Sequence, residues 1–470
     1  MSILFPTAPP AYKLYDQSIL DDESRWNINN AHDPGILKTK DGYYIYSTDV
    51  RVGGELTPGV MVRRSQDLVH WEWVGYALPG IPDIAAEWAQ SVNLWAPDVV
   101  QVGDKYRMYY SASTFGSTRS MIGLMESESP EGPWIDRGSV IRTEPGDGPN
   151  AIDAQVLRDA NGQQWMVYGS FFGGIHILPL DEQTGKPSVH GFGTLLARRD
   201  KETVDSAIEG PYIVYHPQFK QYYLFVSYDS LFKDYNVRVA RADRIDGPYV
   251  DQHGRVMTDL DYRPQHDIGR KILGGYRFSK GEGWIAPGHN SVLCDGEDYY
   301  IVHHARGEQD KSWPYLHIRK MLWTEDGWPV VSPERYAGEQ EQDFDATALA
   351  GSWEWITFDP QQSDLAQSVP FTLHGDGTVS AGVRQGTWIL DNARTLVLEW
   401  NHPQTADIDG QSGFVPIGHT LLKLLPSWDW ERECTTITGT GYDDVGYAVW
   451  AKQLQHGPTD PPPEPAGNEA

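Results

Sequence analysis

The chain has 470 residues, of which 40% are apolar and 22% charged, so it can bury a sizeable core and global disorder is excluded. Its 65 acidic and 38 basic side chains give a formal net charge of −27, so we expect neither nucleic acid nor an anionic membrane surface as a partner. Two cysteines, Cys294 and Cys434, exclude a disulfide framework and are too few for a Cys-based zinc site.

The first 17 residues, MSILFPTAPPAYKLYDQ, lack the basic start and apolar run of a secretory signal. No apolar stretch of about 18 residues, the length needed to span a bilayer, occurs in the chain. We therefore expect a soluble protein, which is cytoplasmic as the chain stands or secreted after removal of a signal.

Aromatic residues are unusually frequent: 18 Trp, 25 Tyr and 13 Phe make up 12% of the chain. Aromatic side chains favour β-strands, and the 47 Gly and 32 Pro favour tight turns between them. The composition predicts an all-β protein.

The aromatic strands belong to a repeat of five units. Each unit begins with a hairpin, in which a short apolar run precedes an aromatic, hydroxyl-rich strand, and further strand-like pieces follow. The first aromatics of these strands lie 63, 59, 57 and 77 residues apart, as the differences of their numbers show. The repeat predicts a five-bladed β-propeller over residues 1–340, with a large β-sandwich as the alternative. The five aromatics are Tyr43, Tyr106, Trp165, Tyr222 and Tyr299.

Three further segments follow from the same pattern. The longest spacing contains the polar, Gly-rich stretch 251–280, which we interpret as an inserted loop. Residues 345–455 hold shorter strands without a further copy of the unit, which predicts a small antiparallel β-barrel or sandwich. The Pro-rich, acidic stretch 457–470 is expected to be disordered.

Candidate catalytic residues stand just before the first strand of each unit. In a propeller these positions converge on one end of the central axis, so the repeat itself nominates a site. Four of the five positions carry a carboxylate and the fifth an imidazole, namely Asp33, Asp98, Asp153, Glu209 and His289. Any one of these carboxylates alone would more simply be a turn residue or a strand-end cap.

Clustered carboxylates repel one another, which raises at least one pKa and separates an acid from a base. Glu209 has apolar neighbours that favour its neutral form, so it is the better general acid. Asp33 stands beside polar His32 and is the better base, while Asp153 can keep Glu209 protonated and orient it. Glycoside hydrolysis needs this division of roles.

Other side chains near these positions suit a sugar. Trp95 and Phe115 offer flat apolar faces to a furanose ring, although either can instead belong to the propeller core. His32, Ser170 and Arg306 can donate hydrogen bonds to sugar hydroxyls.

Five motifs around these residues resemble those of glycoside hydrolase family 43, and among its members those of the two-domain endo-arabinanases. The resemblance covers about residues 25–335, and the small domain is also similar. It implies inverting hydrolysis of α-1,5-linked L-arabinan or arabino-oligosaccharides, with Asp33 as general base, Glu209 as general acid and Asp153 as pKa modulator. The motifs are AHDPGI, LWAPDV, NAIDAQV, AIEGPY and APGHNSV.

The resemblance also implies one calcium ion, or another cation, in the axial channel, held by His289 and a shell of waters. From the residues alone a single histidine is a poor indication, because calcium prefers oxygen ligands. His304 is a weaker candidate ligand.

Several alternatives stay open. An α-L-arabinofuranosidase, a β-xylosidase or a fructan hydrolase has the same fold, and a propeller can bind sugar without cleaving it. The net charge disfavours an anionic polysaccharide, so a neutral arabinan or arabino-oligosaccharide is the expected substrate. The sequence leaves endo or exo action, the oligomeric state and the role of the small domain undecided.

Overall fold

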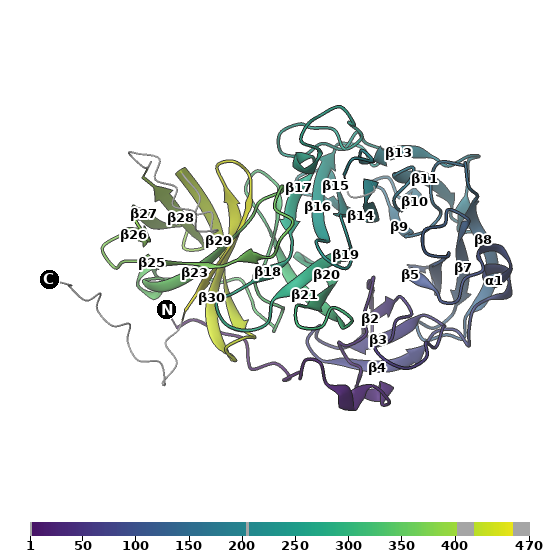
Figure 1. The fold of residues 1–470 in the computed structure, drawn as a ribbon, viewed down its shortest axis with the longest axis horizontal. Helices are drawn as coiled ribbons and strands as arrows, with labels where there is room; N and C mark the ends of the chain where they lie inside the picture. Colours follow the sequence, from purple (N-terminus) through teal and green to yellow (C-terminus); the bar gives the residue numbers. More distant parts are fainter. Residues whose placement is uncertain (1, 204–205, 402–417, 455–470) are drawn as a thin grey trace.

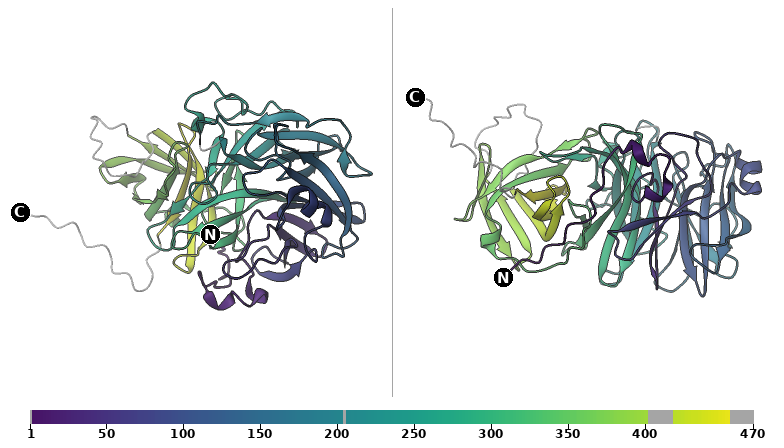
Figure 2. Two further views of the ribbon diagram at one scale, coloured as in Figure 1. Left: turned by 45° about the vertical axis from the view of Figure 1, so that its right-hand side comes forward. Right: turned by 90° about the horizontal axis from the view of Figure 1, so that it is seen from below.

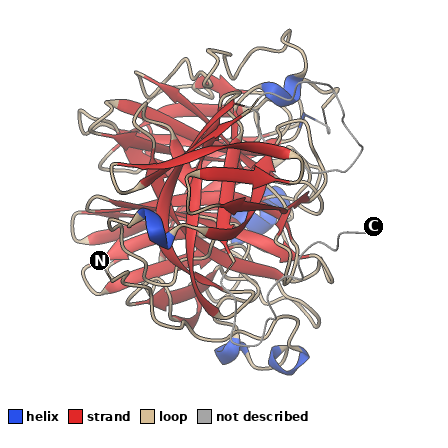
Figure 3. Cartoon of the chain, turned by 90° about the vertical axis from the view of Figure 1, so that its left-hand side faces the viewer, coloured by secondary structure: helices blue, strands red, loops and turns tan. Residues whose placement is uncertain are grey.

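A computed structural model describes residues 2–203, 206–401 and 418–454. These residues form strands and loops with very little helix (Figure 3). Two bodies lie side by side, a ring of β-sheets and a closed β-barrel (Figure 1). The prediction of an all-β protein is confirmed.

The ring consists of five sheets, the blades, built mainly from antiparallel pairs. The strands that open the five repeat hairpins, β1, β5, β9, β14 and β19, contact one another in cyclic order around the axis. The prediction of a five-bladed propeller is thereby confirmed.

Blade I contains β1 (Gly35–Thr39), β2 (Gly42–Ser47), β3 (Met61–Ser65) and β4 (Trp71–Tyr76). Blade II contains β5 (Trp95–Val102), β6 (Lys105–Ala112), β7 (Ser120–Ser127) and β8 (Ile135–Thr143). Blade III contains β9 (Gln155–Arg158), β10 (Gln164–Tyr168), β11 (Ile175–Asp181), β12 (Lys186–Pro187) and β13 (Thr194–Ala197). Blade IV contains β14 (Ile208–His216), β15 (Gln221–Tyr228), β16 (Asn236–Ala242) and β17 (Arg270–Leu273). Blade V contains β18 (Tyr276–Arg277), β19 (Trp284–Asp295), β20 (Asp298–Gly307), β21 (Pro314–Trp323) and β22 (Pro329–Val331).

Helices are few and short. The helix α1 (Asp83–Ala89) joins blades I and II, and no helix in the described part of the chain is long and apolar enough to cross a membrane. The 3₁₀ turns are η1 (Gln17–Ile19), η2 (Glu23–Arg25), η4 (Gln265–Asp267) and η5 (Ala346–Ala348).

The predicted inserted loop at 251–280 is only partly a loop. It contains β17, which pairs with β16 as the outer strand of blade IV, and β18, which pairs with β19 in blade V. Both strands are short and their sequences lack aromatic alternation, so the repeat pattern does not detect them.

The second body is a barrel of eight strands, in which the last strand pairs with the first, so the described barrel strands leave no open edge. This decides between the barrel and the sandwich, and the predicted tail 457–470 lies outside the described residues. The strands are β23 (Gly351–Phe358), β25 (Val369–Leu373), β26 (Thr378–Ala381), β27 (Arg384–Asp391), β28 (Thr395–Trp400), β29 (Gly418–Asp429), β30 (Cys434–Asp443) and β31 (Ala448–Gln453).

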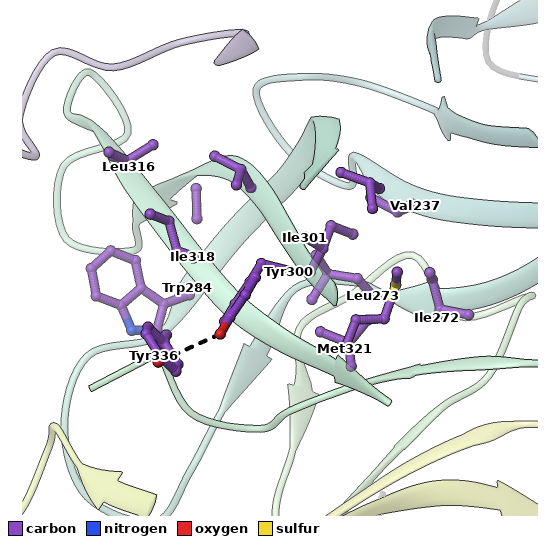
Figure 4. Close-up of a cluster of buried hydrophobic side chains, with 14 of the residues drawn as sticks. Val237, Ile272, Leu273, Trp284, Tyr300, Ile301, Leu316, Ile318, Met321 and Tyr336 are labelled. Atoms are coloured by element: carbon purple, nitrogen blue, oxygen red, sulfur yellow. Dashed lines mark hydrogen bonds between the residues drawn. The ribbon is translucent and has the colours of Figure 1, made fainter. Parts of the chain in front are cut away.

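One apolar cluster extends from the propeller into the barrel. A buried cluster in blade V, which includes Trp284, Tyr300 and Met321 (Figure 4), continues into the barrel through Phe358 and Trp450. In addition, β24 (Ala366–Gln367), which lies between barrel strands in the sequence, pairs with β18 of the propeller. Burial of this continuous apolar surface fixes the barrel against blade V.

The N-terminal segment runs along both bodies (Figure 2). Ile3 and Phe5 pack against the barrel core, whereas the backbone N–H of Tyr15 donates to the Tyr315 hydroxyl of blade V at 2.8 Å. The first residues, which the prediction gave to the propeller, therefore lie on the barrel.

Buried charges lie at the same junction. The Lys452 ammonium of β31 lies 2.8 Å from Glu334, 3.2 Å from Asp429 and 3.1 Å from Glu431. Burial and the charge of Glu431 raise the pKa of Glu334 to about 8, although Lys452 opposes the rise. The ammonium is the counter-charge that makes burial of these carboxylates tolerable.

Replacing Lys452 with Met is expected to destabilise the protein by about 3–5 kcal/mol, because buried carboxylates lose their cation. A carboxyl whose pKa is raised by folding favours the folded state when protonated, so stability is lost as the pH rises. The deficit in Tm relative to wild type should thus be larger at pH 8 than at pH 5. Exposed Lys105→Met is the control, and an equal, small shift for both variants at both pH values contradicts this role.

Candidate active site

One cleft of about 780 Å³ opens at an end of the propeller axis, and residues from all five blades line it. Of the eleven side chains that the sequence nominated for catalysis, sugar binding or metal binding, nine lie on its wall. They are His32, Asp33, Trp95, Phe115, Asp153, Ser170, Glu209, His289 and Arg306.

A repeated backbone bend brings these residues to the axis. In each blade, one residue within or just before the strand β1, β5, β9, β14 or β19 has a left-handed φ between 39° and 60°. For a residue other than glycine this conformation costs about 1–3 kcal/mol, and such strain is concentrated at functional sites. Asp33 and Asp153 are themselves the residues at the bend, whereas Glu209 precedes the bend by one residue. The carboxylates therefore reach the cleft from two different positions relative to the bend. The five residues at the bend are Asp33, Ala96, Asp153, Gly210 and His289.

Asp33 is held by three side chains. Its Oδ1 lies 2.8 Å from Nδ1 of His32 and 3.1 Å from Nδ1 of His289, and the Thr48 hydroxyl donates to Oδ2 at 2.5 Å. Burial alone raises the pKa of this carboxyl, but the charges of His289 and His32 outweigh burial and hold it well below its usual value. Asp33 therefore stays ionised.

Glu209 has the opposite balance. Burial raises its pKa, although the charge of His289 and the hydroxyls of Tyr235 and Ser170 oppose the rise. The Ser170 hydroxyl donates to Oε2 of Glu209 at 2.9 Å, so it orients this carboxyl in addition to facing the cleft, where the sequence suggested a sugar contact. The raised pKa of Glu209 favours its protonated form, as a proton donor requires.

Asp153 also has a raised pKa. Burial, together with repulsion from Glu209 and Asp33, raises its pKa to about 7, although His289 opposes the rise. Its Oδ2 accepts the backbone N–H of Gly210, the residue after Glu209, at 3.2 Å. Asp153 and Glu209 thus repel each other, and Asp153 fixes the backbone next to Glu209.

Two nominated residues stand apart from the cleft. Asp98 lines the narrow axial channel, where Oδ2 accepts the backbone N–H of Val156 at 2.8 Å, so it joins blades II and III. His304 is fully buried on β20, and its Nδ1 accepts the backbone N–H of Asp33 at 3.3 Å. Asp98 thus has a structural partner, whereas Nε2 of His304 is buried without a hydrogen-bond partner.

Aromatic and cationic side chains form the rim of the cleft. Phe115 is 81% exposed, and the Trp95 indole is half-buried and donates to Asn93 at 2.8 Å. The Arg306 guanidinium donates to the carbonyls of Leu231 and Lys311, which holds it at the wall.

Sequence reasoning missed two further aromatics of the rim. Phe172 and Phe232 line the cleft and are 52% and 53% exposed. Like Phe115, each follows the second strand of its blade within a few residues. Aligning the ends of the second strands across the repeat would therefore have identified them, whereas the alignment used only the first strands.

Comparison with known proteins assigns both parts of the chain to described families. Residues 28–329 match the family described as glycosyl hydrolases family 43, and residues 333–451 match a C-terminal lipocalin-like domain. An extracellular endo-α-(1→5)-L-arabinanase of Thermotoga petrophila is 33% identical, over 93% of this chain and 96% of its own length. A crystal structure of endo-1,5-α-L-arabinanase from that organism has a TM-score of 0.78 at 30% identity, covering 91% of this chain and 99% of the other.

Other relatives match about two thirds of this chain. An extracellular exo-α-(1→5)-L-arabinofuranosidase of Cellvibrio japonicus is 32% identical over 64% of this chain and 86% of its own length. The structure of a Cellvibrio cellulosa α-L-arabinanase complexed with arabinohexaose has a TM-score of 0.57 at 30% identity, covering 65% of this chain and 96% of the other.

Proposed function

The chain belongs to glycoside hydrolase family 43, and from this premise we propose that it cleaves α-1,5-linked L-arabinan or arabino-oligosaccharides by an inverting single displacement. The observation that carries the proposal is a cleft in which buried Asp33 is kept ionised while buried Glu209 has a raised pKa. A base and an acid facing one cleft are what single-step glycoside hydrolysis needs.

The reaction is one concerted exchange. Glu209 gives its proton to the glycosidic oxygen as the bond from that oxygen to the anomeric carbon breaks. A water attacks the anomeric carbon from the opposite face, and Asp33 takes one proton from that water. The product hydroxyl then has the inverted configuration, and Glu209 and Asp33 exchange their protons with solvent before the next turnover.

Asp153 supports the acid without touching the leaving group. The two carboxyls repel each other, so a charge on Asp153 disfavours ionisation of Glu209, and the bond of Asp153 to the Gly210 N–H restricts the backbone next to the acid. This is the function of a pKa modulator.

The residues around His289 fit a hydrated cation such as calcium. Nδ1 of His289 lies at Asp33, which leaves Nε2 for a ligand bond, and three carboxylates add negative charge. Beside it in the axial channel, the side-chain amide of Asn290 is buried without a hydrogen-bond partner, so water has a polar wall there. A bound cation would offset the mutual repulsion of the carboxylates.

Metal removal tests this site. After treatment with a chelator, calcium added back is expected to raise the Tm by a few degrees and to restore lost activity, because a ligand that binds only the folded state stabilises it. The His289→Gln variant should lack the Tm response, whereas exposed His374→Gln on the barrel should keep it. A wild-type protein indifferent to chelator and to calcium would remove the cation from the proposal.

The substrate follows from the cleft and the relatives. Exposed rings of Phe115, Phe172 and Phe232 provide apolar faces for several sugar rings, and a net charge of −27 favours a neutral chain. Relatives named endo-arabinanases match 93%, 90% and 70% of this chain, and the relative named exo-acting matches 64%. We therefore favour endo action.

The products formed from linear 1,5-arabinan over time test this function. Endo action predicts a ladder of arabino-oligosaccharides at early times. Release of a single short product from the start would indicate an exo-acting enzyme or an arabinofuranosidase, and xylose released from xylo-oligosaccharides would indicate a β-xylosidase. Binding of arabinan without any new reducing ends would leave only a sugar-binding propeller.

A further inference from the structure

Thr48, which follows β2 in blade I, has a hydroxyl whose hydrogen bonds are fixed in direction. It accepts the backbone N–H of Ala96 at 2.8 Å, and it lies 2.5 Å from Oδ2 of Asp33. A hydroxyl has one proton, and an ionised carboxylate can only accept. Because the Ala96 contact uses a lone pair, the single proton of Thr48 points to Asp33.

The position of Thr48 is fixed on both sides. Its backbone N–H donates to the carbonyl of His32 at 2.9 Å, so it is tied to the residue before Asp33. The next residue, Asp49, is 1% exposed, and its carboxylate accepts the backbone N–H groups of Gly59, Val60 and Leu94 at 2.7–2.9 Å. These bonds hold the chain on either side of the Thr48 hydroxyl.

The same residues reach the sugar-binding wall. The Asn93 amide donates to the carbonyl of Asp49 at 3.0 Å and accepts the indole N–H of Trp95 at 2.8 Å. Thr48 and Asp49 thus connect Asp33 of blade I with Trp95 of blade II.

We propose that Thr48 is a positioning residue, which fixes the rotation of the Asp33 carboxylate relative to the blade II wall of the cleft. Oδ1 of Asp33 is held by two imidazoles, and Thr48 is the side chain that holds Oδ2. Without it the carboxylate can turn away from the water it must activate. The inference rests on the proposed role of Asp33 as base.

The expected effect is large for a residue that touches no substrate. A hydrogen bond to a charged group contributes more than one between neutral groups, and a lost positioning bond lowers the rate of the chemical step. Thr48→Val, which keeps the shape of the side chain, should lower kcat by about 10- to 100-fold with little change in KM. Thr48→Ser keeps the hydroxyl and should recover most of the rate.

Two features separate this role from a structural one. A base acts on water whatever the leaving group, so Thr48→Val should lower kcat equally on arabinan and on an aryl α-L-arabinofuranoside. Because Thr48 acts through Asp33, adding Thr48→Val to Asp33→Asn should cause no further loss.

Thr39→Val is the matched control. Like the Thr48 hydroxyl, the Thr39 hydroxyl donates one hydrogen bond and accepts one from a backbone N–H. It donates to the carbonyl of Gly42 and accepts the N–H of Asp41, both at 3.1 Å, in the same blade but outside the cleft. Its Tm change measures the stability cost of the substitution, and its kcat should match wild type.

The outcomes are distinct. Equal kcat for Thr48→Val and Thr39→Val, with Asp33→Asn inactive, overturns the positioning role and leaves the proposed function intact. An active Asp33→Asn variant overturns the proposed function itself. If Thr48→Val does not fold, Thr48→Ser and Thr48→Ala are compared, and equal rates for these two refute the role of the hydroxyl.

Discussion

Glu209→Ala is expected to lower kcat on arabinan by about 10³-fold, and to lower it far less on an aryl α-L-arabinofuranoside with a good leaving group. The sugar alkoxide released from arabinan needs a proton as it leaves, whereas a nitrophenolate leaves without one. The difference between the two substrates therefore isolates general acid catalysis from any damage to the fold, which would affect both alike.

The pH profile gives a second readout for Glu209. Its raised pKa keeps it protonated to higher pH than an ordinary glutamic acid, and activity is lost as the pH rises through that pKa. On the aryl substrate this alkaline limb should disappear in Glu209→Ala.

Glu339→Gln is the control for Glu209. Burial raises the pKa of Glu339 to about 7, but it lies outside the cleft, so both activities should stay near wild type. Equal losses on the two substrates for Glu209→Ala would exclude Glu209 as the acid.

Asp33→Asn is expected to lower kcat by about 10³- to 10⁴-fold on both substrates. The amide has nearly the size of the carboxylate but cannot take a proton from water, and every substrate needs that water. The loss should appear in kcat, with KM close to wild type, because the sugar-binding wall is unchanged. Steady-state rates on the two substrates provide the measurement.

Asp98→Asn is the control for Asp33. Asp98 is also buried near the start of a first strand, and burial raises its pKa to about 7, but it lies in the axial channel and bonds to the backbone of blade III. Its replacement should change the Tm more than kcat. Substantial activity in Asp33→Asn, or an equal loss of kcat in Asp98→Asn, would contradict the assignment of Asp33.

The sequence predicted the architecture well because each blade repeats one hairpin pattern. The repeat located the five units, and the position before each first strand located the cleft. The strands β17 and β18 were not predicted, because they are short. They form by pairing with the neighbouring strands β16 and β19, a contact that the local sequence does not specify. Closure of the barrel also depends on pairing between β23 and β31, which are far apart in sequence.

Within the site, the sequence predicted which side chains face the cleft but not what they touch. Local chemistry alone favoured Glu209 as acid and Asp33 as base, and the environments of the two residues agree with that order. Ser170 bonds to Glu209, and Thr48 bonds to Asp33. The residues of each pair are far apart in the sequence and meet only in the folded chain. No sequence motif marks a hydroxyl that bonds to a catalytic carboxylate.

The anomeric configuration of the first product tests the central claim most directly. Linear α-1,5-arabino-oligosaccharides are cleaved at high enzyme concentration inside an NMR tube, and the new reducing ends are observed before mutarotation. Inversion predicts that the β-anomer appears first and that the α-anomer grows in later. The α-anomer as the first product would mean a retaining, two-step reaction and would contradict Asp33 acting as a base on water.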